Sequence, residues 1–211
     1  GADNGIPVAV FSLEMASQQL AERMLCGRSK IDSQLLRRNI LGDPDIAKLH
    51  AAADELNQAP IFVDDTPGLT PLELRGKARR LKMQHDIQLV VIDYLQLMHV
   101  PGSEARQQEV STISRHIKAL GRELKVPVIV LSQLNRASEG REGHRPRMSD
   151  LRESGAIEQD ADVIMLLHRE DYYHQGEPDY EKTNSAEVIV AKQRNGPTGT
   201  VMAYFEKQYT M

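Results

Sequence analysis

The sequence predicts an α/β fold in which helices flank a mostly parallel sheet and a C-terminal antiparallel hairpin is added to that sheet. Three observations support this prediction. Short runs rich in Val, Ile and Leu are nearly continuous, as in parallel strands covered on both faces. Helical patterns separate these runs, so strand and helix alternate along the chain. Near the C-terminus, two segments of alternating polarity flank the turn signal Asn195–Gly196.

The apolar runs give the positions of the strands. The expected parallel strands are Val8–Leu13, Ile61–Val63, Leu89–Ile92, Val128–Leu131 and Val163–Leu167. The two strands of the hairpin are expected at Glu187–Lys192 and Thr200–Phe205. Two long polar segments, Asn135–Ser149 and Glu170–Asn184, remain as loops, and long loops in compact domains often carry function.

Four helices are expected between the strands. They are Ser17–Cys26, Asp43–Leu56, a helix that runs from Thr70 toward His85, and Gln107–Lys125. In the second, Asp43 is the expected cap and Pro44 the first helical residue. The third begins with a capping box formed by Thr70 and Glu73. The fourth has one apolar stripe, made by Val110, Ile113, Ile117, Leu120 and Leu124.

The composition is that of a globular protein and excludes several other classes. A length of 211 residues suits one domain or two small ones. With 40% hydrophobic residues, no long apolar stretch and no basic start, the chain shows no disorder, membrane span or secretory signal. A single cysteine, Cys26, excludes an internal disulfide and fits a reduced, intracellular compartment. A net charge of −4 argues against nucleic acid coating the whole surface, but it permits a local basic loop.

Polar side chains follow three of the expected parallel strands. Glu14, Asp93 and Gln133 each come at or just after a strand end, and ligands bind at the carboxyl ends of parallel strands. Asp93 suits Mg²⁺ held through water, Glu14 suits activation of a water molecule, and Gln133 suits contact with a γ-phosphate. Each also has an ordinary interpretation: an Asp before a turn, a Glu in a first helical turn, a loop amide. The three together outline a crevice for phosphate and metal chemistry.

Cations form a second group of candidates. Lys192 and Arg194 precede the tight turn at Asn195–Gly196, and Arg suits bidentate contact with phosphate. The alternative is a solvated hairpin tip. The arginines of Asn135–Ser149 are interspersed with Glu139 and Glu142, so they are only a modest signal for nucleic acid.

Five strings in this sequence resemble, in the same order, the C-terminal RecA-like motor domain of DnaB-type bacterial replicative DNA helicases. The strings are Phe11–Met15, Val91–Met98, Leu131–Arg136, Asp150–Asp162 and Ala191–Gly199. Together they span most of the chain. The resemblance implies a RecA-like fold and an ATP-dependent helicase that uses ATP and Mg²⁺. By position, Glu14 matches the catalytic glutamate, Asp93 the Walker B aspartate that supports Mg²⁺ through water, and Gln133 the γ-phosphate sensor.

The resemblance also implies contacts to other molecules. Lys192 and Arg194 match the basic pair that reaches the ATP of a neighbouring subunit, with Arg194 as the arginine finger. Arg152, Glu153 and Gly155 match the loop that follows single-stranded DNA in the central channel of a ring. The implied partners are single-stranded DNA, further copies in a homo-hexamer, a primase and a helicase loader. The implied location is the cytoplasm, with no membrane partner.

One family feature is missing from this sequence. In the family a P-loop precedes the segment that matches Phe11–Met15, whereas Gly76–Lys77 does not fit the pattern G-x-x-x-x-G-K-[ST]. Pro71 stands at its first glycine, Ala78 follows the lysine, and the pair lies in an expected helix. We therefore expect residues 1–211 to be part of a RecA-like domain without its Walker A segment and without the N-terminal domain that receives primase. We expect no ATP hydrolysis by this chain alone.

Two alternatives stay open on sequence grounds. One is a recombinase or circadian-type ATPase with the same RecA-like core. The strings Asp150–Asp162 and Ala191–Gly199 favour the helicase over this alternative. The other is a non-catalytic interaction module that binds a helicase partner or loader, which the missing P-loop favours for this chain taken alone.

Overall fold

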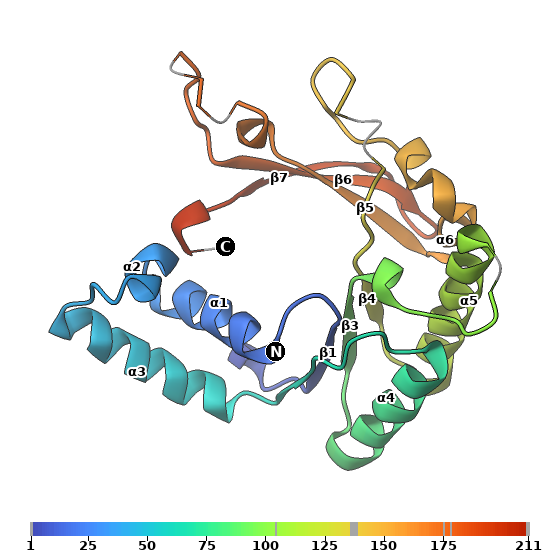
Figure 1. Ribbon diagram of the computed structural model, residues 1–211, viewed down its shortest axis with the longest axis horizontal. Coiled ribbons are helices and arrows are strands. Elements are labelled where there is room, and N and C mark those ends of the chain that lie inside the picture. Colours follow the sequence, from blue (N-terminus) through green and yellow to red (C-terminus); the bar gives the residue numbers. More distant parts are fainter. Residues whose placement is uncertain (1, 104, 136–138, 175, 178, 210–211) are drawn as a thin grey trace. The chain divides into compact units, whose positions relative to one another are not determined.

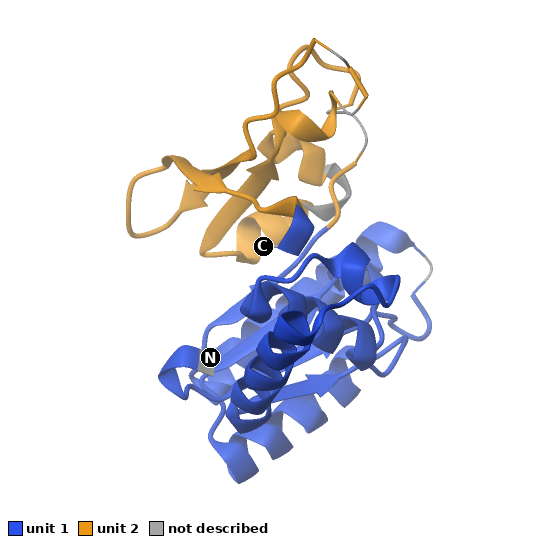
Figure 2. Ribbon diagram, turned by 90° about the vertical axis from the view of Figure 1, so that its left-hand side faces the viewer, with its two compact units in different colours: residues 1–132, 208–211 blue, residues 133–207 orange. Residues whose placement is uncertain are grey.

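The computed structural model describes residues 2–103, 105–135, 139–174, 176–177 and 179–209. The chain divides into two compact units (Figure 2). The first comprises residues 1–132 and 208–211, and the second residues 133–207. The length of the sequence, 211 residues, permits two small units.

A four-stranded parallel sheet forms the centre of the first unit. Its strands are β1 (Val8–Ser12), β2 (Ile61–Asp64), β3 (Leu89–Asp93) and β4 (Val128–Val130), in the order β2-β1-β3-β4. All three pairings are parallel, which confirms four of the five strands expected in a parallel sheet. Figure 1 shows α1 (Ser17–Ser29) and α3 (Asp43–Gln58) on one side of this sheet, with α4 (Pro71–His85) and α5 (Arg106–Leu124) on the other.

Capping residues define where the helices of the first unit begin. The capping box of α4 is confirmed, because Thr70 Oγ1 accepts from the Glu73 N–H and Glu73 accepts from the Thr70 N–H. The N-cap of α3 is Gly42 rather than the expected Asp43, which is the first residue of the helix. A short helix that the sequence analysis missed, α2 (Ser33–Arg37), is capped by the Asp32 carboxylate.

The core of the first unit is aliphatic. All five residues of the predicted stripe on α5 are buried: Val110, Ile113, Ile117, Leu120 and Leu124. They share the core with fully buried strand residues such as Phe11, Val90 and Ile92. Because this core is closely packed, it holds the strands in place and thereby positions their carboxyl ends.

The second unit contains a three-stranded antiparallel sheet. Its strands are β5 (Val163–His168), β6 (Ser185–Gln193) and β7 (Gly199–Tyr204), in the order β5-β6-β7. The expected hairpin is confirmed as β6 and β7, but its expected addition to the parallel sheet is wrong. The assignment of Val163–Leu167 to the parallel sheet is wrong, because β5 pairs with β6 and the hairpin extends this second sheet.

The burial of β5 explains this error. Ile164, Leu166 and His168 are buried, whereas the residues between them are exposed. An apolar run of this kind looks continuous in sequence although only one face packs. The small core here is formed by Leu151, Ile164 and Leu166.

The segment before β5 is partly helical. A 3₁₀ stretch, Met148–Ser154, leads into α6 (Gly155–Asp160), which the sequence analysis did not predict. Among the helices of the described residues, none is long and apolar enough to cross a membrane.

Candidate functional site

Glu14 and Asp93 lie at the same edge of the parallel sheet. β1 and β3 are neighbours, and Ser12, the last residue of β1, is in register with Asp93, the last residue of β3. The Leu13 N–H donates to the Asp93 carbonyl oxygen at 2.6 Å, so the pairing continues past the end of β1. Glu14 follows directly and is exposed, while Asp93 is half-buried. The two carboxylates are therefore brought to one edge, as the sequence predicts.

The turn that carries Glu14 is held from both ends. At its start, the buried hydroxyl of Ser12 donates to the Met15 carbonyl oxygen at 2.7 Å. At its end, the Ser17 N–H, in the first turn of α1, donates to the Asp65 carboxylate at 2.7 Å. Hydrogen bonds from the Ser17 N–H and hydroxyl lower the pKa of Asp65. The sequence analysis missed Asp65, although an acid just after a β-strand is the signal that it also used for Asp93.

The end of β4 completes this edge. The Leu131 N–H donates to the Ile92 carbonyl oxygen at 2.9 Å, and the Leu95 N–H donates to the Leu131 carbonyl oxygen at 3.0 Å. Ser132 accepts a hydrogen bond from the Gln96 side chain at 2.8 Å. Gln133 is the next residue and the first of the second unit, and its side chain is exposed.

The Gly76–Lys77 pair has a structural role. It lies within α4, where Lys77 Nζ contacts Asp64 at 2.5 Å and Thr66 at 2.7 Å. Burial acts to raise the pKa of Asp64, but hydrogen bonds from Lys77 and Thr66 outweigh it and lower that pKa. Lys77 therefore anchors the segment after β2, in agreement with the conclusion that this pair is not a P-loop.

In the second unit, Lys192 and Arg194 contact the end of α6. Lys192 Nζ donates to the carbonyl oxygens of Glu158 at 2.5 Å and Ala161 at 2.8 Å. Arg194 donates to the Gln159 carbonyl oxygen at 2.9 Å, and its Nε lies 3.4 Å from the Asp162 carboxylate. Both side chains therefore have defined partners, and that of Arg194 remains 47% exposed.

The expected DNA loop leads into the same helix. Gly155 is the first residue of α6 and is exposed. Arg152 and Glu153 belong to the 3₁₀ stretch before it, and their side chains lie outside the described part of the structure. One short helix thus connects the backbone of this loop to the contacts of Lys192 and Arg194.

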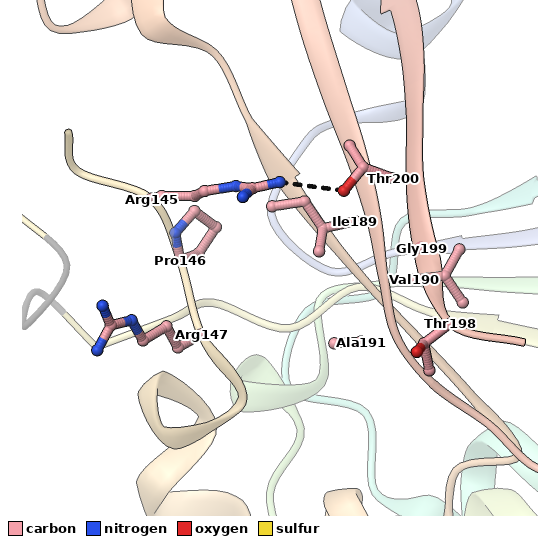
Figure 3. Close-up of a pocket in the computed structure, with 9 residues that line it drawn as sticks. All are labelled: Arg145, Pro146, Arg147, Ile189, Val190, Ala191, Thr198, Gly199 and Thr200. Carbon is pink, nitrogen blue, oxygen red and sulfur yellow. Dashed lines mark hydrogen bonds between the residues drawn. The ribbon is translucent and has the colours of Figure 1, made fainter.

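A groove of about 430 Å³ runs beside the β6–β7 hairpin (Figure 3). Its lining residues are Arg145, Pro146, Arg147, Ile189, Val190, Ala191, Thr198, Gly199 and Thr200. Arg145 spans the groove and donates to Thr200 at 3.0 Å and to Glu187 at 2.7 Å. The guanidinium of Arg147 points away from the strands. Since Glu187 neutralises Arg145, the groove itself is a weak site for anions.

Side chains within the polar segment Glu170–Asn184, after β5, form hydrogen bonds with one another. Asp171 is 6% exposed and accepts from the Tyr180 hydroxyl at 3.0 Å and the Asn184 N–H at 2.7 Å. Burial acts to raise the pKa of Asp171, but these hydrogen bonds and those from Thr183 lower it. Glu170 lies between His168, at 2.9 Å, and His174, at 3.0 Å. No local pattern in the sequence indicates these contacts among the described residues of the segment.

Few side chains of the described residues are placed to ligate a metal ion together. The described residues contain no group of three or more His, Cys, Asp or Glu side chains arranged to hold a metal ion. Asp93 fits the looser mode of Mg²⁺, which keeps several waters and takes one carboxylate together with phosphate oxygens.

The parallel sheet with its polar strand ends, followed by an antiparallel hairpin with two cations, defines a RecA-like domain. The chain belongs to the family described as "DnaB-like helicase C terminal domain", whose profile matches residues 2–211. It is 53% identical over 204 residues to the "Replicative DNA helicase DnaB" of Geobacillus stearothermophilus. It is 51% identical over 204 residues to the "Replicative DNA helicase DnaC" of Bacillus subtilis (strain 168). Each match covers 96% of this chain and 44% of the relative, so the chain spans less than half the length of these relatives.

Solved structures agree with this assignment. One of them, described as an ATPase domain, has a TM-score of 0.92 and 39% identity, and the match covers 100% of this chain and 75% of that one. A DnaB-like replicative helicase, solved in a study of its interactions with primase, has a TM-score of 0.92 and 40% identity, over 99% of this chain and 52% of that one. The RadB recombinase has a TM-score of 0.52 at 17% identity, over 99% of this chain and 79% of that one, which shows a shared fold alone.

Proposed function

We propose that this chain is part of the motor domain of an ATP-dependent replicative DNA helicase, which unwinds duplex DNA by moving along one strand as a ring. The observation that carries the proposal is the register of Ser12 with Asp93, which brings Glu14 and Asp93 to one edge of the sheet. The helicase relatives favour this function over a recombinase, whose likeness is limited to the fold.

Each strand-end residue has a role in ATP hydrolysis in this proposal. Asp93 would hold Mg²⁺ through water, and the bound ion would supply positive charge next to the phosphates. Glu14 is exposed at the same edge, where its carboxylate orients the attacking water and accepts its proton. Gln133 contacts the γ-phosphate through its side-chain amide.

The second unit acts on two other molecules. Lys192 and Arg194 reach the ATP of a neighbouring subunit, where the planar guanidinium stabilises charge on the transferring phosphoryl group. Arg152, Glu153 and Gly155 follow the backbone of single-stranded DNA. The assembly is a homo-hexamer that works with a primase and a helicase loader. Bacterial DNA is replicated in the cytoplasm, which is therefore the proposed location.

The phosphate-binding loop comes from a part of the parent protein outside residues 1–211. The outer edge of β4 supports this, since β4 is the last strand of its sheet and no strand of the described residues pairs with its outer side. Next to this edge, the side chains of Ile129 in β4 and of Leu131 just after it are 45% and 42% exposed. Such an apolar edge accepts a further strand. Without that loop, the chain alone does not catalyse ATP hydrolysis. The alternative of a non-catalytic interaction module therefore applies only to this chain taken alone.

The test uses Glu14→Gln in the parent protein with its P-loop. The change keeps the size of the side chain and removes the base, so ATP binding should persist while hydrolysis falls ~10²-fold or more. Binding of a fluorescent ATP analogue and the steady-state release of phosphate measure the two effects. Turnover near the wild-type rate would show that Glu14 is only a residue at a helix start.

A further inference from the structure

A hydrogen bond of the Gln96 side chain connects the segments that follow β3 and β4 of the parallel sheet. Gln96 lies in the 3₁₀ turn Leu95–Leu97, three residues after Asp93, and Ser132 lies two residues after the end of β4. Gln96 Nε2 donates to Ser132 Oγ at 2.8 Å across 36 residues of sequence. Both side chains are half-buried, so water competes weakly for this bond.

Gln96 is itself held by a network around the buried carboxylate of Glu109. Arg106 donates to the Gln96 carbonyl oxygen and to Glu109. Glu109 is 8% exposed and also accepts from the Val100 N–H at 2.8 Å and contacts His99 at 3.0 Å. The Val100 N–H lowers the pKa of Glu109 although burial acts to raise it, and Arg106 and His99 lower it further. A charged carboxylate therefore holds the segment after Asp93 in place.

This arrangement leaves little freedom where Gln133 begins. Ser132 is held on its side chain by Gln96, and the residue before it is held through its N–H and carbonyl by Ile92 and Leu95. Gln133 is joined to Ser132 by one peptide bond, so the start of its backbone is fixed relative to the end of β4.

We propose that Gln96 and Ser132 are positioning residues for ATP hydrolysis. Their hydrogen bond sets the spacing between the strand ends from which Asp93 and Gln133 act on Mg²⁺ and the γ-phosphate. This inference rests on the proposed function. The bond touches neither ATP nor metal, so its loss changes the rate of the chemical step and leaves nucleotide binding intact. Misplacement of a reacting group by about 1 Å costs ~10²-fold in rate.

The experiment uses the parent protein with its P-loop and compares Gln96→Ala, Ser132→Ala and the double variant. We expect kcat to fall ~10-fold or more in each single variant, within the range set by misplacement. The double variant should be no slower than the single ones, because both remove the same bond. The dissociation constant of a fluorescent ATP analogue should stay within about twofold.

Conservative variants separate positioning from general damage. Ser132→Thr keeps the hydroxyl, and Gln96→Glu offers a carboxylate to which Ser132 donates, so both should recover much of the rate. Gln88→Ala is the matched control, since the side chain of Gln88 bonds only to Asp86 among the contacts described and precedes β3; its kcat should not change. Should Gln96→Ala fail to fold, Ser132→Ala and Ser132→Thr carry the test, since the first removes only a hydroxyl.

Three results would overturn the inference: single variants with kcat within about twofold of wild type, losses that add in the double variant, or slow conservative variants that remain folded. Glu14→Gln, measured in parallel, distinguishes failure of this inference from failure of the proposed function. If Glu14→Gln abolishes hydrolysis while the Gln96 and Ser132 variants stay active, only the positioning role is wrong. If Glu14→Gln stays active, the proposed function fails.

Discussion

Lys192 donates a hydrogen bond from its ammonium group to the carbonyl oxygen of Glu158 at 2.5 Å. The same nitrogen reaches Ala161 at 2.8 Å. Glu158 belongs to α6 and Ala161 follows it, and the last carbonyls of a helix have no partner within the helix. A cation there also interacts favourably with the helix dipole. Lys192 is thus a cap for α6, the helix that begins at Gly155 of the proposed DNA loop.

The first prediction concerns this cap. Lys192→Met keeps an apolar chain and removes the charge and its hydrogen bonds, so α6 should lose about 1 kcal/mol of local stability. Hydrogen exchange measured by mass spectrometry should show faster exchange across Gly155–Asp160. Lys182→Met, at an exposed lysine in the segment after β5, is the control and should leave that peptide unchanged. Equal exchange in both variants would show that Lys192 contributes nothing to α6.

The second prediction is that the 211-residue chain does not hydrolyse ATP by itself. Backbone amides and a lysine of a P-loop cradle the β- and γ-phosphates in this class of enzyme, and this sequence contains no such pattern. Glu14 and Asp93 then have no anchored substrate. Phosphate release by the pure chain, with and without single-stranded DNA, should equal the rate without protein. Turnover that DNA stimulates would contradict this prediction.

The third prediction concerns pH and the segment Glu170–Asn184. Hydrogen bonds that His174 donates to Glu177 and Glu170 raise the pKa of His174 above 6.5. Hydrogen bonds from His174 and His168 lower the pKa of Glu170 below 4.5, against an opposing effect of burial. The contribution of His174 is complete below 6.5 and is lost as pH rises through its raised pKa. The contribution of Glu170 is present above 4.5 and is lost as pH falls through its lowered pKa. The segment should therefore be best ordered between these limits.

Hydrogen exchange tests this dependence after correction for the intrinsic effect of pH on exchange rates. Protection across the segment should be greater at about pH 6 than at a pH above the raised pKa of His174, which a pH series locates. His174→Gln should remove most of the difference, because Gln keeps polar contacts and does not titrate in this range. A difference that survives His174→Gln would assign the pH dependence to another group.

The strand ends could be predicted from sequence because their signals are local. The runs before Glu14 and Asp93 indicate strands by themselves, and parallel strands that are neighbours must end at a common edge. The sheet to which Val163–Leu167 belongs could not be predicted, because a run of apolar residues does not show which face is packed. The contact of Lys192 with α6 spans more than 30 residues, and the Gln96–Ser132 bond spans 36. The spacing of residues within one helix or strand therefore predicts neither of these two contacts.

The last prediction concerns Arg194 and tests the oligomer as well as the site. In this structure Arg194 is engaged by the Gln159 carbonyl oxygen and by Asp162, so contact with a neighbour's γ-phosphate requires an exchange of partners. Because an arginine finger is worth ~10³-fold or more, Arg194→Ala in the parent protein should nearly abolish hydrolysis. Nucleotide binding and ring assembly should persist, since neither depends on that guanidinium.

Mixed rings determine whether Arg194 acts in trans. A Glu14→Gln subunit keeps its finger and can offer it to an Arg194→Ala neighbour whose Glu14 is intact, so mixtures of two inactive variants should recover turnover at intermediate ratios. The measurement is ATPase rate against mixing ratio, with size-exclusion chromatography to confirm ring assembly. If Arg194 only contacts α6, its removal costs local stability, about 1 kcal/mol or less, and single-variant rings keep their activity. Mixtures that show no recovery at any ratio would contradict action across the subunit boundary.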